Sequence, residues 1–525
     1  MTKYLMFQGT SSHVGKSILT TALCRIFFRD GRRVVPFKAQ NMALNSFVTA
    51  DGLEMGRAQV AQAEAANLLP RVEMNPVLLK PTGNQSSQVI INGRAVGVMS
   101  AAEYHQGYSL KAFDAVKAAL KKLSAEFDTI VIEGAGSPAE VNLKANDIVN
   151  MRVAKFLNAP VILVADIDRG GALASLVGTL ELLDDDEREL VKGLVINKFR
   201  GDVNLLLPAV DFLEQKTKKP VLGILPYIDK LGIDDEDSVS LDEKISAGER
   251  DVTIAVVRLG KLSNFTDFDS LAGESDVKLF YATDTSELDA ADVIILPGSK
   301  NTSEDLLALR ENNFVTKILQ RAHDGAAIVG ICGGFQMLGE KLFDPLKTES
   351  NHTELDGLAL LPIETTFAAE KFTRQVTLPE IDFEFMGERI VSENLGGYEI
   401  HSGKTKFVDE HERGDELKFL GGCGASTVWP FFKSGGYEIH SGATNLRGQK
   451  IISTGNVFGT YVHGIFDNDD FRRKFLNAVR RKKNLPPLES TRNFRAEKQK
   501  KYDRLAEVVR KNLNMDLLYK IMATN

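Results

Sequence analysis

Short runs of apolar residues alternate along the chain with longer stretches in which apolar positions recur every three or four residues. The short runs are rich in Val and Ile, which is typical of strands that are buried on both faces of a parallel sheet. In the first half they begin at Tyr4, Arg33, Thr129, Pro160 and Gly193. The longer stretches, such as 17–29 and 109–123, predict amphipathic helices. This alternation of strands and helices predicts a doubly wound α/β domain.

A second series of buried-strand patterns begins at Thr253, Val293 and Ala327. Between the two series, residues 234–250 are acidic, polar and poor in apolar residues, as expected of a linker. After Asp470 the chain becomes basic and shows helical spacing, which predicts a helical tail packed on the second domain. The predicted organisation is therefore an α/β domain at 1–235, a linker at 236–250, a second α/β domain at 251–470 and a helical extension at 471–525.

The composition is that of a large globular protein. The 525 residues are 43% hydrophobic and 26% charged, which favours two or three domains with sizeable cores. A net charge of −7 argues against a nucleic-acid partner. Three cysteines are too few for a disulfide framework, and the chain shows neither a signal peptide nor an apolar run of about 18 residues. We therefore expect a cytoplasmic protein with reduced thiols and no membrane contact.

A glycine-rich loop, GTSSHVGKS at 9–17, follows the first predicted strand and precedes a predicted helix. This is the context in which backbone amides and a helix N-terminus cradle phosphates. We expect Thr10, Gly15 and Lys16 to bind ATP and the Ser17 hydroxyl to bind Mg²⁺. Thr10 stands where the usual motif has its first glycine, so the pattern alone also permits an ordinary glycine turn.

A carboxylate near the metal is also required, and Glu133 ends a predicted strand at the edge where such sheets bind ligands. The alternative is that Glu133 only caps the glycine turn that follows it. Asp51 is a second metal-ligand candidate. Asn197 ends another predicted strand, where it would read the edge of the adenine, although a plain strand terminus has the same pattern. Lys80, Asp166 and Arg169 are substrate contacts or structural ion pairs, which their spacing does not distinguish.

In the second half, Cys332 lies on a sharp turn between a predicted strand and an apolar helix, in GICGGFQM. A helix N-terminus stabilises a thiolate, and flanking glycines leave room for a substrate, so this pattern predicts a nucleophile. His463, in GTYVHG, is the candidate base, although a lone histidine can also be structural. Backbone amides of Gly333 and Gly298 are candidates for an oxyanion hole. The other two cysteines, Cys24 and Cys423, have no catalytic setting, and no structural zinc site is expected.

Ten sequence runs in family order show that the chain resembles the cobyric acid synthase family over essentially its full length. The runs are GTSSHVGKS, PFKAQNMALNS, NPVLLKPTG, VIEGAGSPAE, ADIDRGG, INKFRGD, NFTDFD, LPGSKNT, GICGGFQMLG and GTYVHGIFDN. The resemblance implies a P-loop amide synthetase domain similar to dethiobiotin synthetase. It also implies a second domain that resembles class I glutamine amidotransferases.

The resemblance also implies the reaction. Cys332 and His463 would release ammonia from glutamine, while Lys16, Ser17 and Glu133 would handle ATP and Mg²⁺. The b, d, e and g carboxylates of adenosylcobyrinic acid a,c-diamide would be converted into acyl phosphates and then into amides, in cobalamin biosynthesis. No tightly bound organic cofactor is expected, and the resemblance leaves the oligomeric state open.

Two departures qualify the resemblance. Many class I amidotransferases carry a glutamate two residues after the histidine, but this chain has Ile465 there, so we expect a Cys–His dyad in place of a triad. The run GGYEIHSG occurs twice, at 396–403 and at 435–442, which is most simply explained as a duplication within a surface loop. Neither His401 nor His440 is therefore assigned a role.

Two other families share part of this sequence pattern. Cobyrinic acid a,c-diamide synthases share both chemistries but read Gly-Pro-Asp where this chain has Lys-Ala-Gln-Asn-Met at 38–42, and the Gln-Asn-Met run is the distinguishing part. Partitioning or sensor ATPases carry an extra lysine where this chain has Ser11, and they have no use for Cys332. Both differences favour the cobyric acid synthase family.

Overall fold

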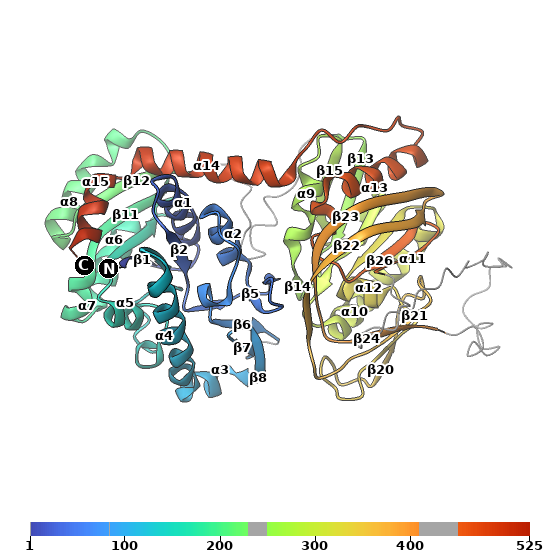
Figure 1. The fold of residues 1–525 in the computed structure, drawn as a ribbon, viewed down its shortest axis with the longest axis horizontal. Coiled ribbons are helices and arrows are strands. Elements are labelled where there is room, and N and C mark those ends of the chain that lie inside the picture. Colours follow the sequence, from blue (N-terminus) through green and yellow to red (C-terminus); the bar gives the residue numbers. More distant parts are fainter. Residues whose placement is uncertain (1, 83–84, 229–248, 409–449, 525) are drawn as a thin grey trace. The chain divides into compact units, whose positions relative to one another are not determined.

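The structure is a computed structural model that describes residues 2–82, 85–228, 249–408 and 450–524. These residues form two compact units, one of residues 2–82, 85–228 and 492–524 and the other of residues 249–408 and 450–491 (Figure 1). The predicted linker at 236–250 lies outside the described residues except for its last two. The second GGYEIHSG run at 435–442 and Cys423 also lie outside them.

The first unit is built on a six-stranded parallel sheet with the strand order β12-β11-β10-β1-β9-β2 (Figure 1). In chain order these strands are β1 (Lys3–Gly9), β2 (Val34–Phe37), β9 (Thr129–Glu133), β10 (Val161–Asp166), β11 (Val191–Phe199) and β12 (Val221–Pro226). Parallel strands need crossover connections, and most of these are helices. All six carboxyl ends therefore lie at one edge of the sheet, where the loops after β1 and β9 meet.

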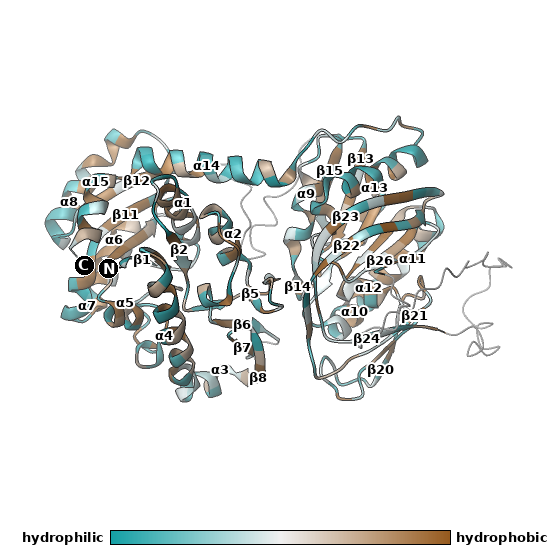
Figure 2. Cartoon of the chain, in the orientation of Figure 1, coloured by the Kyte–Doolittle hydropathy of each residue, from teal (hydrophilic) through white to brown (hydrophobic). Residues whose placement is uncertain are grey.

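Both faces of this sheet are covered, which explains why its strands are apolar throughout (Figure 2). In β1, Leu5 and Phe7 point to a core shared with α1 (Lys16–Arg29), whereas Met6 points to a core shared with α4 (Ser109–Glu126). Successive side chains of a strand point to opposite faces, so an apolar run without alternation is the signature of a sandwiched strand.

The remaining elements of the first unit surround this sheet. The helices are α2 (Arg57–Ala65), α3 (Ala101–Glu103), α5 (Met151–Leu157), α6 (Ala172–Leu182), α7 (Asp185–Leu190) and α8 (Leu207–Thr217). A four-stranded side sheet consists of β3 (Gln40–Met42), β6 (Val77–Pro81), β7 (Ser86–Ile91) and β8 (Arg94–Ser100), and a two-stranded one of β4 (Ser46–Val48) and β5 (Glu54–Gly56).

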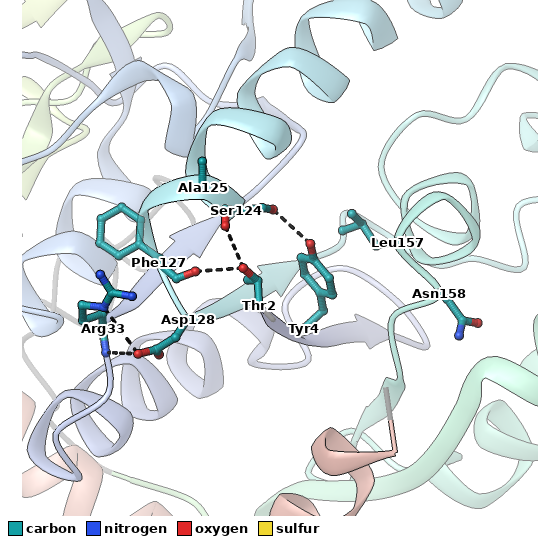
Figure 3. Close-up of a pocket in the computed structure, with 9 residues that line it drawn as sticks. All are labelled: Thr2, Tyr4, Arg33, Ser124, Ala125, Phe127, Asp128, Leu157 and Asn158. Carbon is teal, nitrogen blue, oxygen red and sulfur yellow. Dashed lines mark hydrogen bonds and ion pairs between the residues drawn. The ribbon is translucent and has the colours of Figure 1, made fainter.

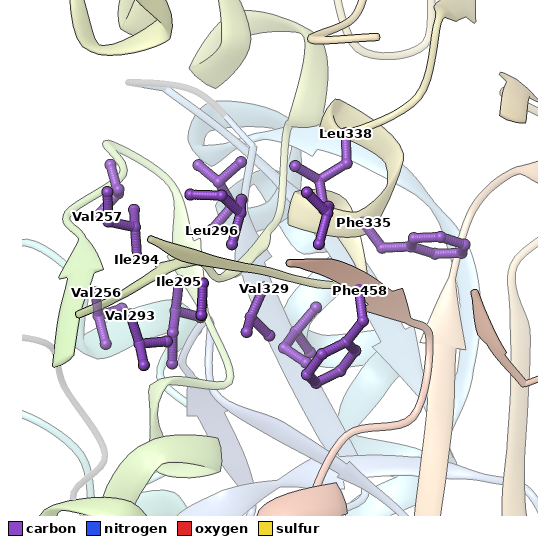
Figure 4. Packing of buried hydrophobic residues seen from close by; sticks show 14 of the residues in the cluster. Val256, Val257, Val293, Ile294, Ile295, Leu296, Val329, Phe335, Leu338 and Phe458 are labelled. Carbon is purple, nitrogen blue, oxygen red and sulfur yellow. The ribbon is translucent and has the colours of Figure 1, made fainter. Parts of the chain in front are cut away.

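The second unit is built on another six-stranded sheet, with the order β15-β13-β16-β18-β26-β25, in which only the β25–β26 pairing is antiparallel. In chain order these strands are β13 (Val252–Val257), β15 (Val277–Ala282), β16 (Val293–Leu296), β18 (Ala327–Ile331), β25 (Ile451–Thr454) and β26 (Val457–Thr460). Figure 4 shows the centre of its core, where side chains of β13, β16, β18 and β26 pack with Phe335 and Leu338.

The other elements of the second unit cover this sheet or extend from it. The helices are α9 (Asp269–Ala272), α10 (Thr302–Glu311), α11 (Phe314–His323), α12 (Gly333–Met337) and α13 (Asp469–Lys482). A long hairpin pairs β22 (Phe372–Phe385) with β23 (Glu388–His401), and β14 (Leu262–Ser263) pairs with β17 (Gly298–Ser299). A small sheet contains β19 (Lys341–Phe343), β20 (Glu354–Asp356), β21 (Ile363–Thr366) and β24 (Lys404–Phe407).

The helical tail differs from the prediction that it packs on the second domain. Helix α13 does pack on β23 and β13 of the second unit. Helices α14 (Phe494–Asn512) and α15 (Met515–Ala523), however, belong to the first unit, where they pack on α1, β1 and β12. The prediction is therefore wrong for these two helices, because their apolar spacing shows that one face is buried but not which surface buries it.

The predicted fold class is confirmed: two doubly wound α/β units and a helical C-terminal tail. Among the described residues, no helix has the length and apolar character needed to cross a membrane.

Candidate functional site

The phosphate loop lies between β1 and α1, as the sequence predicts. Gly15 has φ +100°, and a Cβ there would lie 2.1 Å from Nδ2 of Asn197, so only glycine fits. Asn197, at the end of β11, donates a hydrogen bond from Nδ2 to the carbonyl oxygen of Val14 at 2.7 Å. The asparagine predicted to read adenine therefore braces the phosphate loop in this structure.

Lys16 folds back over this loop. Its Nζ donates hydrogen bonds to the carbonyl oxygens of Ser11 at 2.9 Å and Gly136 at 3.1 Å. The ammonium group thus bridges the loops that follow β1 and β9, and its cationic end is held at the place where phosphates would lie. Thr10 lies in the same loop, where its hydroxyl is 3.3 Å from Oγ of Ser175.

Glu133, at the end of β9, is the centre of a buried polar cluster. Its Oε1 accepts hydrogen bonds from Ser17 Oγ at 2.8 Å and Lys38 Nζ at 2.9 Å, and its Oε2 accepts one from Gln62 Nε2 at 2.6 Å. The structure therefore brings Ser17 and Glu133 together, as the metal hypothesis requires. These two oxygen groups are of the kind that Mg²⁺ prefers, beside a loop for phosphates, so they fit this ion.

Neither Lys38 nor Gln62 was among the residues predicted for this site. Lys38 directly follows β2, the strand that pairs with β9, so its position after a strand end could have signalled a role at this edge. Gln62 lies within α2 and gave no local signal.

Asp51, the other predicted metal ligand, lies in the turn between β4 and β5. Its Oδ1 accepts a hydrogen bond from Thr49 Oγ1 at 2.5 Å, and the side chain is exposed. Within the described ranges, the structure shows no contact between Asp51 and either Ser17 or Glu133. Two further candidates are in ion pairs at 2.9 Å, Lys80 with Glu54 and Asp166 with Lys198.

Cys332 occupies the sharp turn between β18 and α12. Its backbone has φ 53° and ψ −108°, which places the thiol at the N-terminus of the helix. Sγ lies 3.4 Å from the carbonyl oxygen of Ile400, at the end of β23. A Cβ on Gly334 would lie 1.9 Å from the carbonyl oxygen of Leu296, so this turn depends on its glycine. The predicted nucleophile elbow is therefore present.

Cys24 lies in a different environment from Cys332. Burial, with a smaller contribution from the charge of Glu133, raises the pKa of the Cys24 thiol. That side chain is fully buried in the core beside α1. A thiol in such a place is a packing element and a poor nucleophile.

His463 follows β26 and faces Cys332. The two backbones of His463 and Tyr398 exchange hydrogen bonds of 2.8 and 3.1 Å, and the two rings are stacked with centroids 5.2 Å apart. Burial lowers the pKa of His463, but the charges of Asp267 and Cys332 outweigh this effect and raise it to about 10. In the described part of the chain, Nε2 of His463 has no hydrogen-bond partner.

His463 also contacts a carboxylate that the expected Cys–His dyad does not include. Nδ1 of His463 lies 2.6 Å from Oδ2 of Asp267, and both side chains are buried. The histidine therefore does contact a carboxylate, although Ile465 stands at the position where a glutamate was sought. Asp267 is 196 positions earlier in the chain, in the NFTDFD run, so no local spacing around the histidine could reveal it.

The two predicted oxyanion groups lie close to this centre. A Cβ on Gly298 would lie 3.3 Å from Cε1 of His463, and one on Gly333 would lie 2.9 Å from the backbone nitrogen of Ser299. The loop after β16 thus passes over the start of α12. Ser299 anchors this loop through a 2.5 Å hydrogen bond from its hydroxyl to Asp305.

The first GGYEIHSG run forms the end of β23 and lies beside the thiol. Tyr398 stacks on His463, and Ile400 supplies the carbonyl group near Cys332. His401 is buried, stacks on Tyr461 with centroids 3.8 Å apart and has Nδ1 3.1 Å from the carbonyl oxygen of Gly403. The end of this copy of the run therefore lies beside Cys332 and His463.

A separate hollow of about 530 Å³ lies in the first unit at the amino ends of the strands, opposite the phosphate loop (Figure 3). None of the predicted site residues lines it. Its lining residues are Thr2, Tyr4, Arg33, Ser124, Ala125, Phe127, Asp128, Leu157 and Asn158.

Comparison with known proteins assigns each half of the chain to a family. Residues 5–240 match the CobQ/CobB/MinD/ParA nucleotide binding domain, and residues 253–471 match the CobB/CobQ-like glutamine amidotransferase domain. The chain is 50% identical to the cobyric acid synthase of Carboxydothermus hydrogenoformans over 529 residues, which cover 99% of this chain and 100% of that protein. It is also 50% identical to the cobyric acid synthase of Pelotomaculum thermopropionicum over 536 residues, with 99% and 97% covered. Its identity to the cobyric acid synthase of Moorella thermoacetica is 49% over 525 residues, with 99% and 98% covered.

Proposed function

The chain belongs to the cobyric acid synthase family, and we propose from this premise that it amidates four carboxylates of adenosylcobyrinic acid a,c-diamide. ATP would activate each carboxylate, and glutamine would supply each nitrogen. The sites for these two half-reactions are the phosphate loop of the first unit and the thiol centre of the second.

In the glutamine half-reaction, the Cys332 sulfur attacks the carboxamide carbon of glutamine. The oxyanion of the tetrahedral intermediate is stabilised by the backbone amide of Gly333 and by the loop at Gly298. His463 gives its proton to the departing nitrogen, so that ammonia leaves and a glutamyl thioester forms. Water then cleaves the thioester to release glutamate, and His463 accepts the proton of that water.

In the ATP half-reaction, Lys16 and the amides of residues 10–15 hold the phosphates. Ser17 and Glu133 would hold Mg²⁺, which offsets the negative charge of the phosphates when it is bound. A substrate carboxylate oxygen attacks the γ-phosphorus and releases ADP, which leaves an acyl phosphate. Ammonia attacks the acyl carbon, phosphate departs, and a proton is lost to leave the amide.

The proposal depends most on one observation: Cys332 lies on a helix-terminal elbow and faces a histidine bound to a buried carboxylate. A nucleotide-binding unit in the same chain adds the energy source that a ligase needs. A partitioning ATPase would have no use for this thiol.

The test supplies the purified protein with ATP, Mg²⁺, glutamine and adenosylcobyrinic acid a,c-diamide, and follows corrinoid mass together with phosphate release. Cys332→Ala is assayed in parallel with glutamine or with ammonia, and Cys24→Ala serves as a thiol control. We expect successive amide products from the parent protein and from Cys24→Ala. Cys332→Ala should form them only with ammonia, because its ATP site is intact.

Two outcomes would contradict the proposal. Glutamine-driven product formation by Cys332→Ala would remove the thiol from the mechanism. If the parent protein hydrolysed glutamine but formed no amidated corrinoid, the assigned glutaminase reaction would stand. The substrate would then have to be another carboxylate.

A further inference from the structure

The carboxylate of Asp267 contacts Nδ1 of His463, while Cys332 is the other reactive side chain next to this ring and Nε2 has no hydrogen-bond partner among the described residues. We propose that Asp267 is a positioning residue of the thiol centre, which holds the His463 ring so that Nε2 exchanges protons with Cys332 and glutamine. This inference rests on the proposed glutaminase function. It assigns a third member to a centre for which the sequence suggested only two.

The hydrogen bonds around Asp267 fix the tautomer of the histidine. Oδ2 lies 2.6 Å from Nδ1 of His463, and Oδ1 accepts a hydrogen bond from the backbone N–H of Gly464 at 3.0 Å. An ionised carboxylate can only accept, so Nδ1 must carry a hydrogen. In the neutral ring Nε2 is then the unprotonated nitrogen, and it is the one without another partner among the described residues.

Burial lowers the pKa of His463, and the charge of Asp267 is the main influence that raises it. The side chains facing the ring are Asp267, Cys332, Tyr398 and His401. Burial lowers the pKa of His401 to about 4, so His401 carries no charge at neutral pH. With burial acting against the charged form of His463, the Asp267 carboxylate sustains an imidazolium beside Cys332. This imidazolium is the proton donor that departing ammonia requires.

The segment that carries Asp267 is held on both sides. Phe265 and Phe268 are each 1% exposed and anchor the short 3₁₀ turn Phe265–Phe268 in the core. Asn264 precedes this turn and donates a hydrogen bond from Nδ2 to the hydroxyl of Tyr398 at 3.1 Å. Tyr398 in turn stacks on the histidine. The carboxylate and the ring therefore share one set of supports, as expected for a preorganised pair.

An asparagine at position 267 separates this role from a purely structural one. The Gly464 N–H would keep the amide oxygen, so the amide NH₂ group would face Nδ1 of His463. Nδ1 would then have to accept, and the proton would move to Nε2, which faces Cys332. The shape of the side chain would be retained, but the histidine could no longer accept the proton of the thiol.

The experiment compares the full-length parent protein with Asp267→Asn. The alkylation rate of Cys332 by iodoacetamide is measured from about pH 5 to about pH 9, together with kcat and KM for glutamine hydrolysis. Asp276→Asn is the matched control, because Asp276 is equally buried in the same unit but pairs with Arg473 and Arg480 of α13.

We expect Asp267→Asn to slow alkylation at neutral pH by about 10-fold or more, since less thiolate remains. Its kcat for glutamine should fall by about 100-fold or more with little change in KM, because the substrate contacts are intact. Amidation with ammonia should persist, and Asp276→Asn should retain the parent alkylation profile. A parent-like alkylation profile and kcat in Asp267→Asn would overturn the proposal.

A double variant tests whether Asp267 acts through His463. His463→Gln lacks the proton acceptor, so adding Asp267→Asn to it should slow alkylation no further. A further loss in the double variant would mean that Asp267 acts other than through His463, and would overturn the proposal. The alkylation rate of Cys332 is measured without glutamine. It would therefore still test the role of Asp267 if the parent protein failed to hydrolyse glutamine.

Discussion

At the scale of single residues, Glu133 accepts hydrogen bonds from the Ser17 hydroxyl, the Lys38 ammonium and the Gln62 amide. The side chains of Glu133 and Lys38 are 1% and 5% exposed, so both charges are removed from water. Such a pair is costly to break, because each buried charge loses its nearest opposite charge. The metal site proposed here therefore includes a cation of the protein itself.

This pair gives a stability prediction. Glu133→Gln should lower the free energy of unfolding of the first unit by about 3 kcal/mol, because it removes the buried carboxylate that faces the Lys38 ammonium. Lys38→Met should have a similar effect, and the double variant should lose clearly less than the sum. The free energies of unfolding are measured by urea titration, with hydrogen exchange of the β1 and β9 amides as the readout for the first unit. Strictly additive losses would show that the pair is not coupled.

At the scale of elements, the β18–α12 turn presents the nucleophile because adjacent segments approach very closely. Helix α12 lies against the end of β16, and Gly334 donates its N–H to the carbonyl oxygen of Pro297 at 3.0 Å. A Cβ on Gly334 would lie 1.9 Å from the carbonyl oxygen of Leu296, which is backbone and cannot rotate away. The elbow therefore needs a residue without a side chain at this position.

We accordingly predict that Gly334→Ala abolishes glutamine hydrolysis and destabilises the second unit by about 3 kcal/mol. Gly396→Ala is the matched control, since a Cβ at this strand glycine would meet no atom within 4 Å. The control should change stability by less than about 0.5 kcal/mol. Thermal unfolding measures the change in stability, and a glutaminase assay measures the change in activity. Parent-like activity in Gly334→Ala would show that the turn can widen without loss.

At the scale of the whole molecule, the last two helices return to the unit formed by the start of the chain. Helix α14 packs on α1, and α15 packs on β1. Tyr502 donates a hydrogen bond to Glu64 at 2.8 Å, and Arg25 is paired with Asp503 at 2.8 Å. The first unit is thus completed only by residues that come after the entire second unit.

This arrangement predicts where a tail substitution acts. Leu505 is fully buried in the core shared with α1, so Leu505→Ala should destabilise the first unit by about 3 kcal/mol. Hydrogen exchange of β1 should accelerate while that of β18 in the second unit stays unchanged. Lys511→Ala, on the exposed face of α14, should alter neither. Faster exchange in β18 upon Leu505→Ala would place the tail with the second unit instead.

Local pattern was enough to predict most strands of the two central sheets, the phosphate loop and the cysteine elbow, but not the β22–β23 hairpin. Continuous apolar runs identify sandwiched strands, and glycines between a strand and a helix identify both loops, because these signals depend only on neighbouring residues. The run GICGGFQM therefore led directly to Cys332, which the structure places on its elbow. The fold class and the family followed from the same local runs.

Tertiary structure alone decided which distant residues complete each site. Asp267 reaches His463 across 196 positions, and Lys38 and Gln62 reach Glu133 across 95 and 71 positions. The docking of α14 on α1 depends likewise on segments from opposite ends of the chain. Such contacts follow from strand order and helix packing, which hydrophobic periodicity does not encode. A buried face shows that a partner exists, but only the folded chain identifies that partner.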